Sequence, residues 1–206
     1  MKILRLSFAL LLSLLFVSAF AETLAPQSAQ TIQALYTPRG SSIAGNPNGK
    51  VVLVEFFDYN CAYCRALQPT VQRLIQKNPD LKVVYKEILL YDESLPATAA
   101  AFAATKQGQY LAMHRALLTA RNPLTPIEVV KIAKRNGLNV AKLTADMATS
   151  QARTITNDNL ALVRKLRIEG TPAFVIGTST RPLYLFEGSE RAEAALQSYI
   201  NQAKRQ

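Results

Sequence analysis

The chain contains only two cysteines, Cys61 and Cys64, separated by two residues. They directly follow an apolar run, KVVLVEFFDY (residues 50–59), and the second cysteine opens CRALQPTVQRLIQK (residues 64–77), whose large apolar residues recur at helical spacing. The first run is rich in β-branched and aromatic residues and lacks alternation, which is typical of a strand buried on both faces. A thiol pair at a strand-to-helix junction predicts a parallel pairing and a right-handed crossover at the cysteines.

The remaining pattern predicts an α/β core interrupted by an all-helical insertion. LKVVYKEILL (residues 81–90) indicates a second strand, a long helical block follows, and AFVIG and LYLFEG (residues 173–177 and 183–188) indicate two more strands before a closing helix near Ser189. We expect a loose, turn-rich leader with a short helix near residues 29–35. The expected parts are a signal peptide at 1–21, a leader at 22–50, a core at 51–92 and 168–206, and the insertion at 93–167.

One helix of the insertion has clear end signals. TPIE at residues 125–128 has the form of a capping box, with Thr125 as the cap, Pro126 at the first helical position and Glu128 at the third. Gly137 is a suitable residue to end that helix.

The first residues, MKILRLSFALLLSLLFVSAFA, have the pattern of a secretory signal peptide. Lys2 and Arg5 precede an apolar core at residues 8–17, and Ala19 and Ala21 provide a small-residue cleavage site. An uncleaved anchor helix is the alternative, which the short apolar core disfavours. We therefore expect cleavage after Ala21 and export to an oxidising compartment, the periplasm.

In that compartment the two cysteines are of little use as a structural bridge. A mature chain of about 185 residues can bury a sizeable core without a disulfide. A Cys-X-X-Cys disulfide closes a very small loop, so it hardly constrains the unfolded chain. The sulfurs are therefore expected to be present for their reactivity.

The basic character of the chain does not indicate a nucleic-acid partner. The net charge is +10, and removal of Lys2 and Arg5 leaves about +8, since 10 − 2 = 8. The basic residues are scattered over expected helices, where a solvated face is the ordinary interpretation, and an exported protein has little access to nucleic acid. Weak attraction to an anionic membrane surface stays open.

The predicted position of each cysteine implies a different role. Cys61 begins the helix, where unpaired amides and the helix dipole stabilise an anion, so its pKa should fall. Cys64 lies one turn further along and should be more covered. We expect Cys61 to exchange disulfides with other proteins through a mixed-disulfide intermediate, and Cys64 to resolve that intermediate.

Metal and hydrolase sites fit these residues poorly. A structural zinc site needs four ligands, whereas the chain offers two cysteines and a single histidine, His114. His114 lies in an amphipathic helical pattern and is expected to be a packed helix residue. A Cys-His hydrolase pair would leave Cys64 without a role, so we expect no metal and no cofactor.

The segment VVLVEFFDYNCAYCRALQP resembles the active site of the DsbA-like thioredoxin-fold oxidoreductases, in particular an exported subgroup with an FDY-X-C-X-Y-C signature. The resemblance continues through GQYLAMHRALL, EGTPAFVIG and the closing helix, and covers about residues 36–204. It implies a thioredoxin fold with a helical insertion and thiol:disulfide oxidoreductase activity. Pro69 resembles the proline that kinks the family's active-site helix, by removing one hydrogen bond.

The resemblance also implies a second segment at the site. Pro172 resembles the family's cis-proline, whose loop faces the disulfide and pairs with the backbone of a bound substrate. Thr171 would then touch the sulfurs and help to set specificity, and the Thr171–Pro172 bond is expected to be cis.

Glu55 matches a buried acid beneath the family's active site that manages the proton of the resolving thiol. The alternative is a strand residue turned to a polar edge. Lys86 would either accompany Glu55 or be an ordinary solvated lysine.

The chain departs from the family pattern in two places. Its dipeptide is Ala62–Tyr63, without the histidine of the strongest oxidants, and EILL replaces a proline-containing segment. With Tyr63 beside the site, we expect the Cys61 pKa to lie between about 3.5 and 8.5.

Three functions remain open. The first is a periplasmic dithiol oxidase that gives its disulfide to reduced exported proteins, is reoxidised by a quinone-linked, DsbB-like membrane partner, and is a monomer. The second is a disulfide isomerase or reductase kept reduced by a membrane electron donor. Isomerases of this superfamily usually carry a separate dimerisation domain, which residues 22–50 are too few to form. The third is a chaperone that binds peptides along its helical insertion.

Overall fold

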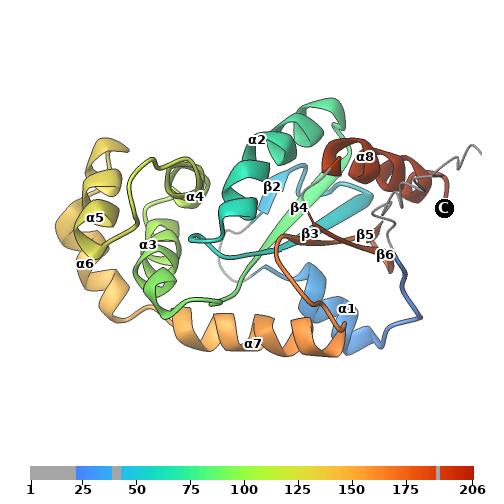
Figure 1. Ribbon diagram of the computed structural model, residues 1–206, viewed down its shortest axis with the longest axis horizontal. Helices are drawn as coiled ribbons and strands as arrows, with labels where there is room; N and C mark the ends of the chain where they lie inside the picture. The colour runs from blue at the N-terminus through green and yellow to red at the C-terminus, as the bar shows by residue number, and fades with distance from the viewer. Residues whose placement is uncertain (1–21, 39–42, 189–190) are drawn as a thin grey trace, which may run out of the picture.

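The computed structural model describes residues 22–38, 43–188 and 191–206, so the predicted signal peptide lies outside the described residues. A six-stranded sheet carries helices on both faces (Figure 1). The strands are β1 (Glu22–Thr23), β2 (Ile43–Gly45), β3 (Val51–Phe57), β4 (Leu81–Glu87), β5 (Ala173–Thr178) and β6 (Pro182–Glu187). The helices are α1 (Ala29–Tyr36), α2 (Ala62–Lys77), α3 (Leu95–Thr105), α4 (Tyr110–Leu118), α5 (Pro126–Arg135), α6 (Val140–Ala148), α7 (Ala152–Lys165) and α8 (Ala192–Ala203), with a 3₁₀ turn at Asp92–Ser94.

Strand β3 is the central strand that its apolar run predicts. All seven of its residues are buried. It pairs in parallel with β4 and antiparallel with β5, within the order β1-β6-β5-β3-β4-β2. The predicted parallel pairing across the cysteine-bearing helix is therefore confirmed.

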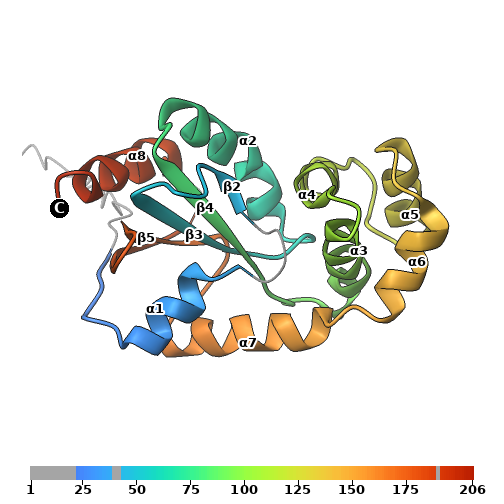
Figure 2. The same ribbon diagram turned by 180° about the vertical axis from the view of Figure 1, so that it is seen from behind.

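The two faces of the sheet bury different residues of β3, because successive side chains of a strand point to opposite faces. Val52, Val54 and Phe56 belong to a core with residues of α1 and α7. Leu53 and Phe57 belong to a larger core with residues of α2, α8 and the insertion. Figures 1 and 2 show the same two layers, with α2 and α8 on one side of the sheet and α1 and α7 on the other.

The helical block packs around α3. Ala97, Ala100, Ala101 and Ala104 have no exposed surface, and α4, α5, α6 and α7 all contact this helix. Small side chains let neighbouring helices approach closely, which explains the alanine-rich sequence. Helices α3 to α6 lie beyond one end of the sheet, while α7 returns along its second face (Figure 1). Thus the last helix of the 93–167 block packs on the core.

The expectation of a loose leader is wrong. Strand β1 pairs antiparallel with β6, and β2 pairs antiparallel with β4, so the leader forms both edges of the sheet. Between them, α1 buries Leu35 and Tyr36 against the second face. The short helix predicted near residues 29–35 is therefore confirmed as α1. The polar, turn-rich composition hid only β1 and β2, because edge strands this short are held by backbone hydrogen bonds to neighbours that are distant in sequence.

The predicted helix ends at α5 are confirmed. The Thr125 hydroxyl accepts a hydrogen bond from the Glu128 amide at 3.2 Å, although the Glu128 carboxylate binds Arg135 instead of closing the box. Gly137 has a φ of +76°, a conformation that glycine adopts easily just after a helix. The closing helix α8 begins at Ala192, slightly later than expected.

Candidate active site

Both cysteines lie where β3 leads into α2, as predicted. Cys61 is the N-cap residue of α2, and its backbone amide donates to the Asp58 carbonyl at 3.1 Å. The exposed fraction is 6% for Cys61 and zero for Cys64, and both thiols are free. Only the first sulfur therefore reaches the surface, at the start of a helix.

The surroundings of Cys61 stabilise its thiolate. Hydrogen bonding from the Cys64 thiol lowers the pKa of Cys61 to about 5, against an opposing effect of burial, with further help from the Thr171 hydroxyl and the amides of Cys64 and Tyr63. The Thr171 hydroxyl donates to the Cys61 sulfur at 3.3 Å. These donors are the anion-binding end of α2 together with one side chain from across the site.

Cys64 has the opposite electrostatic character. Its hydrogen bond to the Cys61 sulfur and its burial raise the pKa of Cys64 far above that of an ordinary thiol. A buried thiol that keeps its proton while its neighbour is a thiolate can attack only when a nearby group accepts that proton. The geometry thus separates a partly accessible thiol of low pKa from an enclosed second thiol of high pKa.

The loop before β5 closes the site from the other side. The Thr171–Pro172 bond is cis, as expected, and the Thr171 carbonyl lies 3.5 Å from the Cys61 sulfur. The Glu187 carboxylate accepts hydrogen bonds from the amides of Glu169 and Gly170, at 2.7 and 3.0 Å. Sequence reasoning did not identify this role of Glu187, because eighteen residues separate it from Glu169.

Asp58 holds the loop that carries Cys61. One carboxylate oxygen accepts from the Asn60 amide at 2.7 Å and from the Ser94 hydroxyl at 2.5 Å. The other accepts from the Leu90 amide at 2.9 Å. Asp58 thus joins the active-site loop to the segment before α3. Its short-range bond to the amide two residues on is a typical aspartate turn, which the FDY-X-C stretch could have revealed.

Glu55 lies beneath the cysteine-bearing helix. It is 1% exposed and shares the face of β3 that carries Leu53 and Phe57, so the polar-edge alternative is wrong. Burial, and then the charge of Glu87, raise the pKa of Glu55 to about 8. Its charge also raises the pKa of Cys64, after the larger effects of the hydrogen bond to Cys61 and of burial.

Lys86 neither accompanies Glu55 nor is solvated. It is 3% exposed, and its ammonium donates to the carbonyls of Ala34 and Thr37 at 2.8 and 2.9 Å. Those carbonyls belong to α1 and its C-cap, on the second face of the sheet. The residue opposite Glu55 in the register is Tyr85, so Lys86, one residue further along β4, points to the opposite face of the sheet.

His114 is the packed helix residue that the sequence predicts. It is 1% exposed, its ring centroid lies 4.1 Å from that of Tyr85, and its Nδ1 lies 3.1 Å from the Tyr59 hydroxyl. Burial lowers the pKa of His114 to about 3, so the ring is neutral. Across residues 22–38, 43–188 and 191–206, no group of three or more His, Cys, Asp and Glu side chains could hold a metal ion.

Two exposed tyrosines lie near the active-site loop. Tyr63 is 64% exposed and Tyr91 is 50% exposed. A cavity of about 600 Å³ begins at Asn60, next to Cys61, and extends past Tyr91 to the loop before α5. Pro69 lies inside α2, at the position that the family resemblance indicates.

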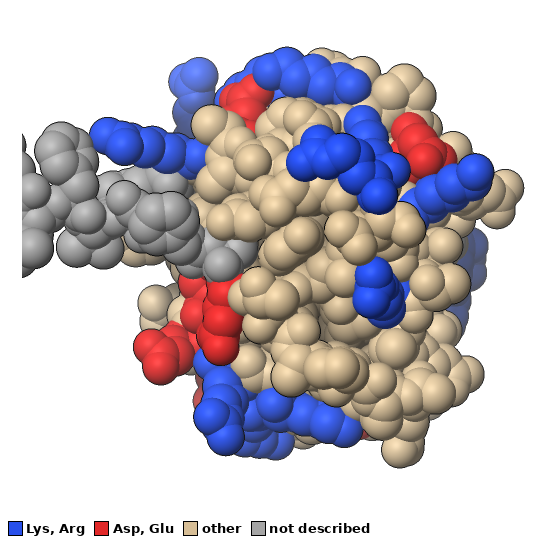
Figure 3. All heavy atoms as spheres, turned by 90° about the vertical axis from the view of Figure 1, so that its right-hand side faces the viewer, with Lys and Arg blue, Asp and Glu red and all other residues tan. Residues whose placement is uncertain are grey.

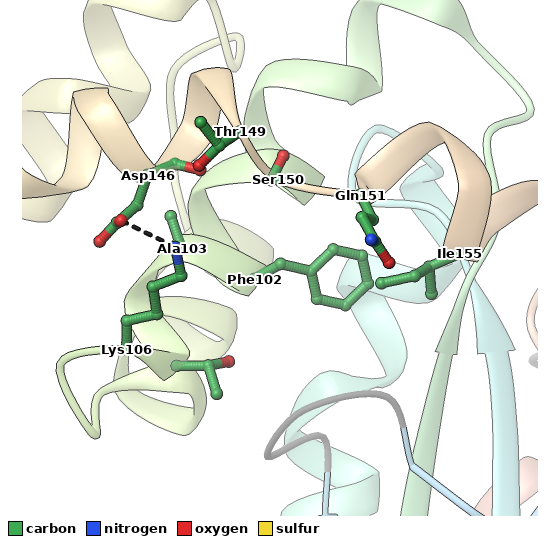
Figure 4. Close-up of a pocket in the computed structure, with 9 residues that line it drawn as sticks. Phe102, Ala103, Lys106, Asp146, Thr149, Ser150, Gln151 and Ile155 are labelled. Atoms are coloured by element: carbon green, nitrogen blue, oxygen red, sulfur yellow. Dashed lines mark hydrogen bonds and ion pairs between the residues drawn. The ribbon is translucent and has the colours of Figure 1, made fainter.

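Other surface features lie away from the cysteines. A cavity of about 340 Å³ between α3, α6 and the start of α7 is lined by Phe102 and Ile155 and bordered by the ion pair of Lys106 and Asp146 (Figure 4). Figure 3 shows Lys and Arg side chains scattered between uncharged areas, in agreement with the dispersed charge of the sequence. Among the described residues, no helix combines the length and apolar character that crossing a bilayer requires.

Comparison with known proteins identifies the family of this fold and site. Residues 52–200 match the model of the DSBA-like thioredoxin domain. A thioredoxin-like oxidoreductase from Silicibacter pomeroyi is 34% identical, with a TM-score of 0.75 over 84% of this chain and 98% of its own. A periplasmic thioredoxin-like protein from Salmonella enterica is 25% identical, with a TM-score of 0.72 over 88% and 100%.

Curated relatives are of two kinds. The thiol:disulfide interchange protein DsbA of Burkholderia cepacia is 26% identical over 84% of each chain. A Na⁺/H⁺ antiporter of Salinispora tropica is 25% identical over 68% of this chain, and the match spans only 22% of that longer protein.

Proposed function

Since this chain belongs to the DSBA-like thioredoxin domain family and is a thiol:disulfide oxidoreductase, we propose that it is a dithiol oxidase, which introduces disulfide bonds into exported proteins. The observation that supports an oxidase is the stabilised Cys61 thiolate, whose pKa is about 5. A stabilised thiolate favours the reduced enzyme, so the oxidised enzyme gives up its disulfide readily.

The reaction begins with a substrate thiolate that attacks the sulfur of Cys61 in the Cys61–Cys64 disulfide. A substrate–Cys61 bond forms, the Cys61–Cys64 bond breaks, and the electron pair remains on Cys64. A second substrate thiolate then attacks the substrate sulfur of the mixed disulfide and releases Cys61 as a thiolate. Two electrons have passed from the substrate dithiol to the enzyme.

Glu55 is proposed to manage the proton of Cys64. When Cys64 leaves as a thiolate in this buried position, protonated Glu55 supplies a proton. When Cys64 attacks, the Glu55 carboxylate accepts one. An acid whose pKa is about 8 is better matched to a thiol than an ordinary carboxyl group is.

Thr171, Pro172 and Tyr63 are proposed to contact the substrate. Thr171 touches the reactive sulfur, and its backbone would pair with an extended substrate segment. The exposed ring of Tyr63 lies between the cysteines in sequence and offers apolar contact area. Unfolded substrates expose apolar segments that such a surface can cover.

The proposed setting is the periplasm, with a quinone-linked, DsbB-like membrane protein as the reoxidant and a monomeric enzyme. The predicted signal peptide and the likeness to a periplasmic thioredoxin-like protein support the location. The antiporter match brings no transport activity into this proposal, because it spans about a fifth of that protein.

The reduction potential in glutathione buffers tests the oxidase. We expect a value well above the roughly −270 mV of thioredoxin and fast oxidation of a reduced model substrate, with little rescue of a scrambled one. Cys61→Ala is the matched inactive control. Light scattering after size exclusion should give the mass of one chain. A thioredoxin-like potential, or a stable dimer that rescues scrambled substrate strongly, would favour the isomerase or reductase instead.

A further inference from the structure

A second carboxyl group is buried on the same face of the sheet as Glu55. Glu87 is 1% exposed and pairs with Phe57 in the parallel register, one strand across and two residues along from Glu55. Standard strand dimensions place the two Cα atoms about 8 Å apart. Glu55 and Phe57 share a face because they are two residues apart on β3, and Glu87 shares that face because it is the register partner of Phe57. Both carboxyl groups therefore lie on the face that α2 and α4 cover.

The two carboxyl groups have different partners. The Tyr110 hydroxyl, from α4, donates a short hydrogen bond to the Glu87 carboxylate, and Asn159 anchors the Glu87 carbonyl at 2.8 Å. In contrast, one oxygen of Glu55 is buried without a hydrogen-bond partner. The negative charge is therefore better placed on Glu87, and a proton is better placed on Glu55.

The other titratable groups around this pair are largely neutral. They are Cys64 on α2, Tyr59 in the loop after β3, Tyr85 on β4, and Tyr110 and His114 on α4. Cys61 is a thiolate in the reduced protein, but it carries no charge in the mixed disulfide that Cys64 resolves. Burial keeps the tyrosines protonated and His114 uncharged. Two cations also act on these groups: Lys86 lowers the pKa of Glu87, and Arg115 lowers the pKa of Tyr85 and of His114.

We propose that Glu87 is a positioning residue for thiol exchange: its carboxylate, held by Tyr110, keeps a proton on Glu55 and thereby sets the pH range in which Glu55 exchanges that proton with Cys64. This inference rests on the proposed role of Glu55. In the resolving step the proton moves from the Cys64 sulfur to the Glu55 carboxylate. The Cys64–Cys61 bond forms, the bond from Cys61 to the substrate sulfur breaks, and the substrate leaves as a thiolate.

The charge state of Glu87 supports this role. Burial raises the pKa of Glu87 to about 7, against the hydrogen bond from Tyr110. Glu87 is therefore ionised when Glu55 titrates near 8. For two charges separated by as much as the Cα atoms, about 8 Å, and an effective dielectric constant of about 20, one charge displaces the titration of the other by roughly 1.5 pH units.

The test is a single-turnover reaction of reduced protein with oxidised glutathione, followed from pH 5 to 10. The first phase is attack by Cys61, and the second is release of glutathione by Cys64. In the wild type the second phase should accelerate around pH 8, with the titration of Glu55. Glu87→Gln should move that midpoint down by roughly 1 to 1.5 pH units. Glu55→Gln should remove the inflection.

Two further variants provide a control and a second way of changing the charge of Glu87. Glu193→Gln removes a carboxylate on α8 that pairs with Arg73 and Lys77, and should leave the midpoint unchanged. Tyr110→Phe removes the hydrogen bond that lowers the pKa of Glu87, so part of Glu87 becomes neutral. The midpoint for Glu55 should then shift down, by less than it does in Glu87→Gln. This variant decides the matter if Glu87→Gln does not fold.

The outcomes separate this inference from the proposed function. A purely structural role of Glu87 would slow both phases at every pH and leave the midpoint in place. Coincident midpoints in wild type, Glu87→Gln and Tyr110→Phe would overturn the role of Glu87 while leaving the oxidoreductase intact. Failure of the wild type to release glutathione at any pH would instead refute the proposed exchange chemistry, and this inference with it.

Discussion

Replacement of Thr171 by valine tests how the second loop activates Cys61. Valine keeps the shape of the side chain but removes the hydroxyl that donates to the Cys61 sulfur at 3.3 Å. The cis-proline that follows is unchanged. Any change in the thiolate should therefore come from the loss of one hydrogen bond.

The expected size follows from that bond. A hydrogen bond to a charged group contributes about 1.5 to 3 kcal/mol, and about 1.4 kcal/mol corresponds to one pH unit. The pKa of Cys61 should rise from about 5 to between roughly 6 and 7. The loss of thiolate stabilisation at neutral pH should lower the reduction potential by roughly 30 to 50 mV.

Two measurements check this expectation on the same samples. Thiolate absorbance during a pH titration gives the pKa of Cys61, and equilibration with glutathione gives the potential. Thr178→Val is the matched control, because its hydroxyl contacts Thr180 in the β5–β6 turn, away from the cysteines. A Thr171→Val protein with the wild-type pKa would show that α2 and Cys64 alone stabilise the thiolate, and would refute the argument.

Four further results are expected. Cys64→Ala should trap mixed disulfides on gels and Cys61→Ala should not, and equal trapping would contradict the assignment of the two sulfurs. Tyr63→His should lower the Cys61 pKa in an absorbance titration, by less than about one pH unit because position 63 is 64% exposed and screened; no shift would contradict the idea that tyrosine limits the oxidant. Because the pKa of Cys61 is lower in the folded protein than in the unfolded chain, its thiolate stabilises the folded reduced protein at pH values above about 5. The free energy of urea unfolding of the reduced protein, measured relative to that of the oxidised protein, should therefore fall by roughly 2.7 kcal/mol between pH 7 and a pH below 5, and a constant difference would argue against a thiolate. Asp58→Asn should lose about 1 to 3 kcal/mol of unfolding free energy, because an amide nitrogen cannot accept from Leu90; unchanged stability would show that this loop needs no carboxylate.

Much of the site could be predicted because its signals are local. A buried strand that ends at Phe57, and a helix that starts just after Cys61, place the first sulfur at a helix N-terminus whatever the rest of the chain does. The caps of α5 and the central position of β3 follow from the same kind of pattern. The Thr171–Pro172 segment was found through family resemblance, since spacing alone does not bring two segments 110 residues apart together.

The partners of Glu55 could not be obtained from pattern alone. Strand alternation puts Glu55 on the face of Leu53 and Phe57, but which residues of β4 share that face depends on a register that local sequence does not encode. Tyr85 and Glu87 face the site, whereas Lys86, which lies between them on β4, faces α1. A register shifted by one residue would exchange these two faces. The leader was misread for the same reason, because its short strands exist only where an edge of the sheet is free to pair. Local periodicity therefore determined the reactive thiol, whereas the electrostatics beneath it were decided by strand register and by hydrogen bonds, such as that of Tyr110 to Glu87, that form only after the chain has packed.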